Sequence, residues 1–118
     1  MKNHRVVTWQ EVENYIEFLI NKLPEGIVGI YGIPRGGNVI ATILSYRLDL
    51  PLLQAPIEGC LVVDDISDTG KTLVHYKEKG YLIATMFIHK DTCVMPDYWF
   101  LEKNDHWIQF PWEEKCSE

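Results

Sequence analysis

Short apolar runs rich in β-branched residues alternate along this chain with segments of helical periodicity. Each run ends at glycine, proline or charged residues, which is typical of a buried strand. The predicted strands are 27–31, 51–53, 60–63, 81–88 and 98–101, and the predicted helices between them are 39–48 and about 69–79. This alternation predicts a three-layer α/β fold, with a mainly parallel central sheet and helices on both faces.

The N-terminal part adds another helix. Thr8 and Glu11 have the spacing of a capping box, in which a hydroxyl and a carboxylate satisfy free amide groups. Apolar residues then recur at helical spacing, at Val12, Tyr15, Ile16, Leu19, Ile20 and Leu23. They predict an amphipathic helix that ends at 24–26 (PEG). We expect irregular structure at 107–112 and a frayed tail at 113–118.

The composition limits the possible functions. With 118 residues, 47% of them hydrophobic, the chain is expected to form one globular domain that spans 1–118. Its formal charge of −6 argues against sequence-independent binding of nucleic acid, which requires clustered Lys and Arg. A small anionic ligand is compatible with this charge, because backbone amides and a metal ion can hold it.

Cysteine usage and hydropathy indicate the compartment. Cys60, Cys93 and Cys116 are odd in number and far apart, which argues against a disulfide framework and against a zinc site. The N-terminus lacks the apolar run of a signal peptide, and no apolar stretch approaches transmembrane length. We therefore expect a soluble, cytoplasmic protein that does not bind a membrane.

The strongest functional signal is the stretch 60–72 (CLVVDDISDTGKT). Its apolar strand would deliver Asp64 and Asp65 to the carboxyl edge of the sheet, where ligands bind in open parallel sheets. The turn 69–72 (TGKT), at the start of the predicted helix, would point several amides at one spot and form a phosphate cradle. The carboxylates could accept hydrogen bonds from ribose hydroxyls or help to hold Mg²⁺.

This stretch also resembles two simpler arrangements, a P-loop and a capped helix. A P-loop is excluded, because the earlier glycine of that motif would have to stand at Asp65. A merely capped helix after an acidic turn is the simpler alternative. However, the three carboxylates at Asp64, Asp65 and Asp68 repel one another without a cation, which argues against a purely structural role.

The stretch 32–37 (GIPRGG) is a second candidate loop. It follows a predicted strand and precedes a predicted helix. Gly36 and Gly37 would let the backbone approach phosphates closely, while the guanidinium of Arg35 offers a charged fork for them. A glycine-rich turn of this kind is common, but its place one helix before the acidic stretch makes a joint site more plausible.

Together the two motifs resemble type I phosphoribosyltransferases, whose signature runs from an apolar strand through paired acids to D-T-G-x-T. The resemblance implies a fold of that family with a reduced hood, and transfer of ribose 5-phosphate from magnesium-bound PRPP to a base, with release of pyrophosphate. It implies that Asp64 and Asp65 bind the ribose hydroxyls and help, directly or indirectly, to hold the magnesium. The 5-phosphate would be bound by Asp68, Thr69, Gly70, Lys71 and Thr72, and the pyrophosphate by Arg35, Gly36 and Gly37. Asp68 would also accept a proton from the base, so that Asp68 and Arg35 are the expected catalytic residues.

The order of motifs towards the C-terminus is similar to 6-oxopurine members of the family, especially the bacterial xanthine-guanine type. That similarity implies that Lys90 contacts the 6-oxo group, that Trp107 stacks on guanine, xanthine or hypoxanthine, and that Ile108 presents backbone groups to the base edge. Core packing is the alternative for both Trp107 and Trp112. We expect stacking for Trp107 and core packing for Trp112.

One part of the family pattern is missing. Members carry a long flexible loop before the signature strand, but only 52–59 stands at this place, and so few residues cannot form a lid. A non-catalytic PRPP- or nucleotide-binding regulatory protein of the same fold is therefore the alternative function. A flavodoxin-like or response-regulator domain explains neither the DTGKT turn nor the second glycine loop. Family members commonly form dimers or larger homo-oligomers, and the same is expected here.

Overall fold

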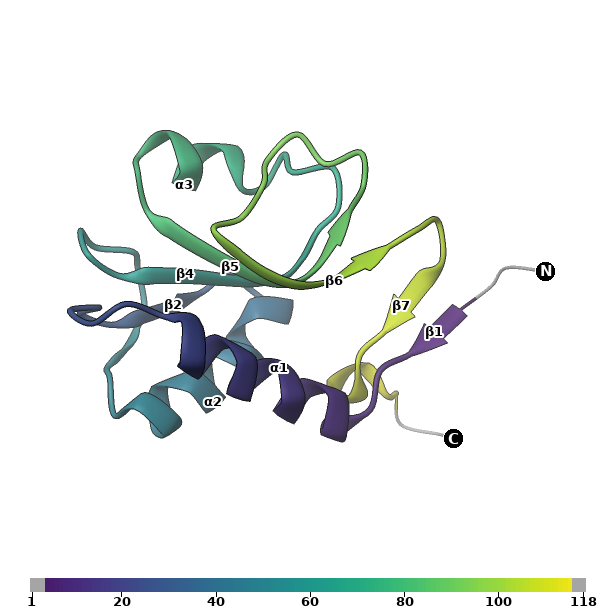
Figure 1. Ribbon diagram of the computed structural model, residues 1–118, viewed down its shortest axis with the longest axis horizontal. Helices are drawn as coiled ribbons and strands as arrows, with labels where there is room; N and C mark the ends of the chain where they lie inside the picture. Colours follow the sequence, from purple (N-terminus) through teal and green to yellow (C-terminus); the bar gives the residue numbers. More distant parts are fainter. Residues whose placement is uncertain (1–3, 116–118) are drawn as a thin grey trace.

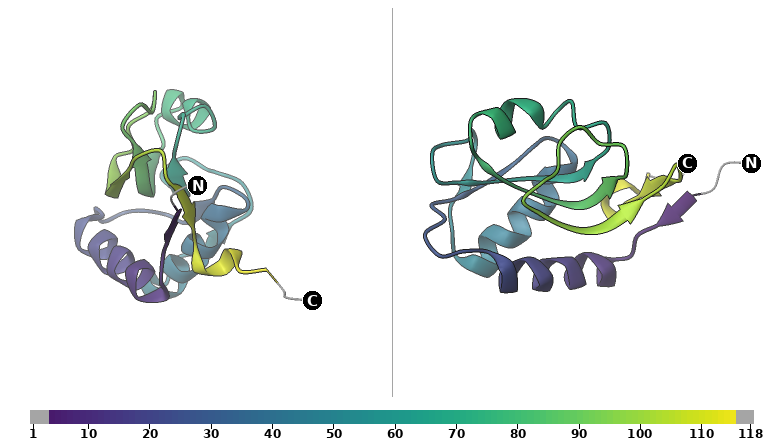
Figure 2. Two further views of the ribbon diagram at one scale, coloured as in Figure 1. Left: turned by 90° about the vertical axis from the view of Figure 1, so that its right-hand side faces the viewer. Right: turned by 45° about the horizontal axis from the view of Figure 1, so that its top comes forward.

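A five-stranded parallel sheet lies between two layers of helices in the computed structural model, which describes residues 4–115 (Figure 1). The strands are β2 (Ile30–Gly32), β3 (Leu52–Leu53), β4 (Leu61–Ser67), β5 (Leu82–His89) and β6 (Tyr98–Lys103). They are parallel throughout and lie in the order β3-β2-β4-β5-β6. Helices α1 (Trp9–Lys22) and α2 (Gly36–Leu48) cover one face, and the short α3 (Val74–Glu78) lies on the other (Figure 2). This confirms the predicted three-layer fold.

Burial in the core follows the sequence pattern. The predicted capping box of α1 is formed, because the Glu11 amide donates to Thr8 Oγ1 and the Thr8 amide donates to Glu11 Oε1. The apolar side of α1 packs with α2 against one face of the sheet, and a smaller apolar cluster under α3 covers the other face. Strand β4 is buried by both clusters, which fixes the position of its carboxyl end.

Two elements around the acidic stretch differ from the sequence prediction. Strand β4 does not end at Val63 but continues through both acids, because β5 offers it a partner as far as Ser67. The helix predicted from about Thr69 begins only at Val74. Gly70 has a φ of 89°, a left-handed conformation that a right-handed helix cannot contain. The prediction that turn 69–72 opens a helix, and gains from its dipole, is therefore wrong.

The two ends of the chain form a small second sheet. Strand β1 (His4–Val6) pairs in parallel with β7 (Trp107–Gln109), and a 3₁₀ helix, η1 (Pro111–Glu113), follows. The irregular structure predicted for 107–112 is thus wrong, since the partner strand of β7 comes from the far end of the sequence. Both strands lie to one side of the main sheet and form the reduced hood (Figure 1). Of the predicted tail, Glu113 belongs to η1, and 116–118 lie outside the described residues.

The segment before β4 is hydrogen-bonded at the end of the molecule that lies opposite the carboxyl edge of the sheet. The Val28 amide donates to the Gly59 carbonyl (3.1 Å), and the Leu61 amide donates to the Gly29 carbonyl (3.0 Å). These bonds hold the segment beside the amino ends of β2 and β4, on the side away from β1 and β7 (Figure 1). The segment is short, as predicted, and these bonds anchor it away from the carboxyl edge. No helix within 4–115 has the length and apolar character needed to cross a membrane.

Candidate active site

The two predicted motifs meet at the carboxyl edge of the sheet. The Ile33 amide donates to the Val63 carbonyl of β4 (2.9 Å), and the Gly37 amide donates back to the Ile33 carbonyl (2.9 Å). A Cβ on Gly36 would overlap the carboxylate of Asp65, and a Cβ on Gly37 would overlap the Val63 carbonyl oxygen. Only glycine permits this approach, so the loop 32–37 lies directly on the middle of β4, at residues 63–65.

Asp64 and Asp65 form a mostly buried acidic pair. The Asp65 amide donates to Asp64 Oδ1 (2.9 Å), and the Ile66 amide donates to Asp65 Oδ1 (2.8 Å). Burial, and then the neighbouring charge of Asp65, raise the pKa of Asp64 to about 8. Burial also raises the pKa of Asp65. Hydroxyl donors or a cation supplied by a ligand would relieve this unfavourable burial of negative charge.

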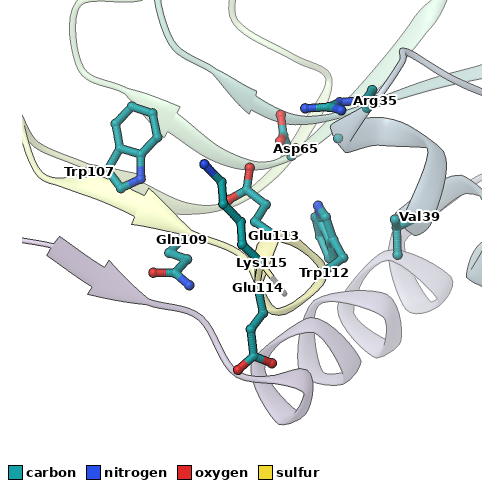
Figure 3. A pocket seen from close by; sticks show the side chains of 10 residues that line it. Arg35, Val39, Asp65, Trp107, Gln109, Trp112, Glu113, Glu114 and Lys115 are labelled. Carbon is teal, nitrogen blue, oxygen red and sulfur yellow. The ribbon is translucent and has the colours of Figure 1, made fainter. Parts of the chain in front are cut away.

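A cleft of about 890 Å³ opens beside Asp65 of this pair (Figure 3). It is lined by Arg35, Gly36, Val39, Asp65, Trp107, Gln109, Trp112, Glu113, Glu114 and Lys115. Trp107 is 64% exposed, so it is not a core residue, and its indole stands on the cleft wall facing Asp65 and Arg35. The structure therefore brings together Arg35, Gly36, Asp65 and Trp107, which the sequence placed in one site.

The predicted 5-phosphate turn lies outside this cleft. Asp68, Thr69, Lys71 and Thr72 are exposed, while Gly70 is buried against the connection between β5 and β6. The turn is held by hydrogen bonds from the Cys93 amide to the Thr69 carbonyl (2.9 Å) and from the Lys71 amide to Thr69 Oγ1 (3.2 Å). Lys90 is exposed directly after β5 and does not line the cleft either.

The remaining predicted contacts lie in the hood. Ile108 is 5% exposed, so its side chain belongs to the core. Its strand β7 pairs only with β1 in the described part of the chain, which leaves the backbone of the other edge of β7 without a strand partner. Trp112 packs on Phe110 with ring centroids 4.8 Å apart, as its predicted core role requires. Trp112 also lines the cleft, which the sequence did not indicate.

Six cleft residues were missed at the sequence level: Val39, Gln109 and Trp112, and, at and after the C-terminal turn, Glu113, Glu114 and Lys115. Lys115 points its ammonium group into the cleft (Figure 3). A signal for the turn that places these last three residues was present, because Pro111 and Glu113 occupy the first and third positions of a helical turn. Glu113 Oε1 accepts the Phe110 amide (2.9 Å), which fixes the turn against the hood.

Magnesium is the metal that the family resemblance implies. Among the described residues, no group of three or more His, Cys, Asp or Glu side chains could form a metal site by itself. Mg²⁺ is usually bound by one or two carboxylates together with waters and substrate phosphates. Asp65 fits this mode, because its carboxylate lines the cleft, and neither Asp65 nor the adjacent Asp64 has a cationic partner in the described chain.

Sequence relatives point in the same direction. No family model matches the chain. A xanthine-guanine phosphoribosyltransferase of Vibrio vulnificus (strain YJ016) is 30% identical over 140 positions, which cover 96% of this chain and 91% of the relative. Because 96% of 118 residues is about 113, about 27 of the 140 aligned positions have no counterpart here. The chain is therefore a shortened version of its relatives.

Solved structures agree with the sequence relatives. A purine phosphoribosyltransferase from Pyrococcus horikoshii is 34% identical, with a TM-score of 0.82 and coverage of 98% of this chain and 97% of that one. The xanthine-guanine-hypoxanthine phosphoribosyltransferase of Helicobacter pylori has the same fold, with a TM-score of 0.78 at 18% identity and 94% coverage of both chains. The chain thus belongs to the type I phosphoribosyltransferases, in the group represented by the xanthine-guanine enzymes.

Proposed function

We propose that this chain transfers the ribose 5-phosphate of PRPP to a 6-oxopurine base and releases pyrophosphate. The observation that carries the proposal is the contact between the loop 32–37 and the acidic residues of β4, next to a cleft with an exposed indole. This arrangement offers a cation for an anionic leaving group, carboxylates for a ribose and an aromatic face for a base. All three lie at the edge of the sheet where such folds bind ligands.

The reaction forms a bond between a base nitrogen and C1 of the ribose, and it breaks the C1–O bond, whose electron pair leaves on pyrophosphate. The transition state resembles an oxocarbenium ion, so little covalent catalysis is needed. The protein has to align the two reactants and stabilise the departing charge. We assign ribose binding to Asp64 and Asp65, and pyrophosphate binding to Arg35 with the amides of Gly36 and Gly37.

The purine would be held on the hood side. Trp107 would stack on the base, the free edge of β7 at Ile108 would meet the base edge, and Lys90 would contact the 6-oxo group. Asp68 would accept the proton that the base loses. The 5-phosphate would bind to the turn 69–72, whose amides and hydroxyls are donors without a helix dipole. The long side chain of Lys90 and this turn would have to reach towards the cleft when substrates bind.

Magnesium would be held at Asp64 and Asp65, directly or through water. When bound, it supplies positive charge that neutralises the phosphate oxygens of PRPP.

The proposed activity can be tested directly. The protein is incubated with Mg²⁺, PRPP and guanine, xanthine or hypoxanthine in separate reactions, and both the nucleotide and pyrophosphate are measured. We expect equal amounts of the two products with at least one base. The double variant Asp64→Asn/Asp65→Asn is expected to lose product formation. If PRPP does not bind and this variant behaves like the wild type, the proposal is wrong.

A regulatory PRPP- or nucleotide-binding protein is the second candidate. The anchored segment between β3 and β4 favours it, because without a lid the reacting atoms stay accessible to water. Calorimetry distinguishes the two functions. Binding of PRPP without conversion of any base would favour the regulatory function.

A second subunit could supply the missing cover of the cleft. We propose a homodimer or a larger homo-oligomer that acts in the cytoplasm on small molecules, without nucleic acid or membrane partners. Light scattering at several protein concentrations measures the oligomeric state, and a monomer at all of them would contradict this part of the proposal.

A further inference from the structure

The last pair of residues in register between β5 and β6 has two polar side chains that the proposed mechanism does not use. His89 and Lys103 stand opposite each other in register. Only 12% of the His89 side chain and 11% of the Lys103 side chain are exposed. Lysine is rarely this buried unless a partner compensates its charge. Each of the two side chains contacts an acid on a different loop at the carboxyl edge.

His89 joins two loops through both nitrogens of its ring. Its Nδ1 accepts the Asp91 amide (3.0 Å), so that Nδ1 carries no proton. Its Nε2 therefore carries the proton and donates it to Asp105 Oδ1 (3.0 Å). The hydrogen bond from His89 lowers the pKa of Asp105. Lys90 follows His89 directly, and Trp107 follows two residues after Asp105, so that one side chain ties the loops of both proposed purine contacts.

Lys103 reaches a third loop. It ends β6, and its Nζ lies 3.5 Å from Oδ1 of Asp68, which follows β4. Because β5 lies between β4 and β6, the lysine side chain crosses the carboxyl end of β5. Asp68 itself is 59% exposed, and Lys103 is the only cation that the structure pairs with it among residues 4–115.

We propose that His89 and Lys103 are positioning residues of the purine site: His89 holds the Lys90 and Trp107 loops together, and Lys103 holds Asp68 in place for proton acceptance. The inference rests on the proposed function, since it depends on the roles given there to Asp68, Lys90 and Trp107. Fixed contacts of this kind keep reacting groups aligned before the substrate arrives. They would matter more in a chain that has no long loop to close over the base.

The His89 contact predicts a selective effect on the base. In His89→Ala and in Asp105→Ala, the KM for the purine is expected to rise roughly three- to tenfold, which is the range for one lost hydrogen bond. The KM for PRPP should stay within about twofold of the wild-type value. His89→Gln keeps an N–H donor and is expected to restore most of the affinity. The double variant should be no worse than either single one, because both remove the same bond. His75→Ala, at an exposed histidine of α3, is the matched control and should behave like the wild type.

The Lys103 contact predicts a different signature. In Lys103→Met, kcat is expected to fall roughly tenfold, while the KM for the purine stays within about twofold, because a misplaced acid slows proton transfer and leaves stacking intact. Lys103→Arg keeps the cation and should recover most of kcat. In an Asp68→Asn background, Lys103→Met should cause no further loss.

Three results would overturn the inference: an unchanged purine KM in Asp105→Ala, an equal rise of both KM values in His89→Ala, or a wild-type kcat in Lys103→Met. Asp105 is 93% exposed, so its substitution keeps the test valid even if His89→Ala does not fold. If the wild-type chain converts no base, it is the proposed function that fails. Calorimetric titration with guanine in the presence of Mg²⁺ and pyrophosphate then decides the inference, and equal affinity in the wild type and Asp105→Ala overturns it.

Discussion

The loops 32–37 and 68–72 have similar sequences of small and charged residues, but they are held in different ways. The first joins β2 directly to α2, and its glycines lie against the backbone and acid of β4. The second leaves β4 through a left-handed glycine, Gly70, and the helix α3 begins only at Val74. Loop 32–37 therefore packs into the core of the sheet, whereas loop 68–72 is a surface turn beyond the end of β4.

The support of the second loop comes from the connection between β5 and β6. Ser67 Oγ bonds to Thr92 Oγ1 (2.8 Å) and donates to the Val94 carbonyl (3.0 Å), and a Cβ on Gly70 would lie 2.7 Å from the Val94 amide nitrogen. Asp68, Thr69, Lys71 and Thr72 are exposed, and an exposed loop opens locally at a lower free-energy cost than a segment packed on a central strand. We infer that 32–37 is preformed and that 69–72, beyond the contact of Asp68 with Lys103, adjusts when a ligand binds.

Gly37→Ala tests whether the first loop is part of the core. The new Cβ would meet the Val63 carbonyl, so the free energy of unfolding is expected to fall by about 3 kcal/mol or more. Gly80→Ala is the matched control, because Gly80 has a φ of 81° but nothing within 4 Å. It should cost only about 1 kcal/mol, for the left-handed backbone. Urea unfolding measures both, and equal losses would contradict the close approach of Gly37.

Arg35→Ala and Lys71→Ala compare the exposed cations of the two loops. Arg35 lines the cleft beside Asp65, and Lys71 does not. We expect kcat/KM to fall roughly 100-fold in Arg35→Ala, as for other groups that stabilise a departing charge. In Lys71→Ala we expect a fall of about threefold, because an exposed flexible lysine contributes little. Steady-state kinetics with PRPP as the varied substrate give both values, and equal losses would mean that the turn is as preformed as the first loop.

The two loops also show what the sequence could predict. Local pattern predicts the helices α1 and α2 and the buried strands. The topology of parallel sheets then predicts that Arg35 and Gly36 lie beside Asp65. The start of α3 could not be placed, because Gly70 is left-handed and packs closely against Thr92, Cys93 and Val94. The decisive contact is distant in sequence.

The hood was unpredictable for a similar reason. Strand β7 exists because β1, about a hundred residues earlier in the chain, supplies its hydrogen-bond partner, with His4 opposite Trp107. No window of local sequence contains both strands. Without the hood, the residues 113–115 have no reason to line a cleft, which explains why they were assigned to a tail.

Trp107→Ala and Trp112→Ala separate ligand binding from packing among the residues that line the cleft together with Arg35 of the first loop. The exposed Trp107 should contribute mainly to stacking, so the KM for the purine is expected to rise roughly tenfold, with stability unchanged within about 0.5 kcal/mol. Trp112, stacked on Phe110, should show mainly a loss of stability, of about 2 kcal/mol. Kinetics and thermal unfolding of both variants check this, and a stability loss in Trp107→Ala would place its indole in the core.

The acidic pair lies between the two loops, and its protonation should make stability depend on pH. An aspartate in the unfolded chain has a pKa of about 4, whereas Asp64 in the folded chain has a pKa of about 8. Between these values the folded state holds a proton that the unfolded state has released, so the free energy of unfolding should fall as pH rises through this window. Asp64→Asn removes this contribution, and its stability relative to wild type should grow by about 1 kcal/mol per pH unit.

Urea unfolding at pH 5, 6, 7 and 8 measures the difference, with Glu58→Gln in the exposed segment before β4 as the control. Parallel curves for Asp64→Asn and wild type would show that the carboxyl is already ionised in the free protein, so that the site between the loops needs no ligand to accept its charge.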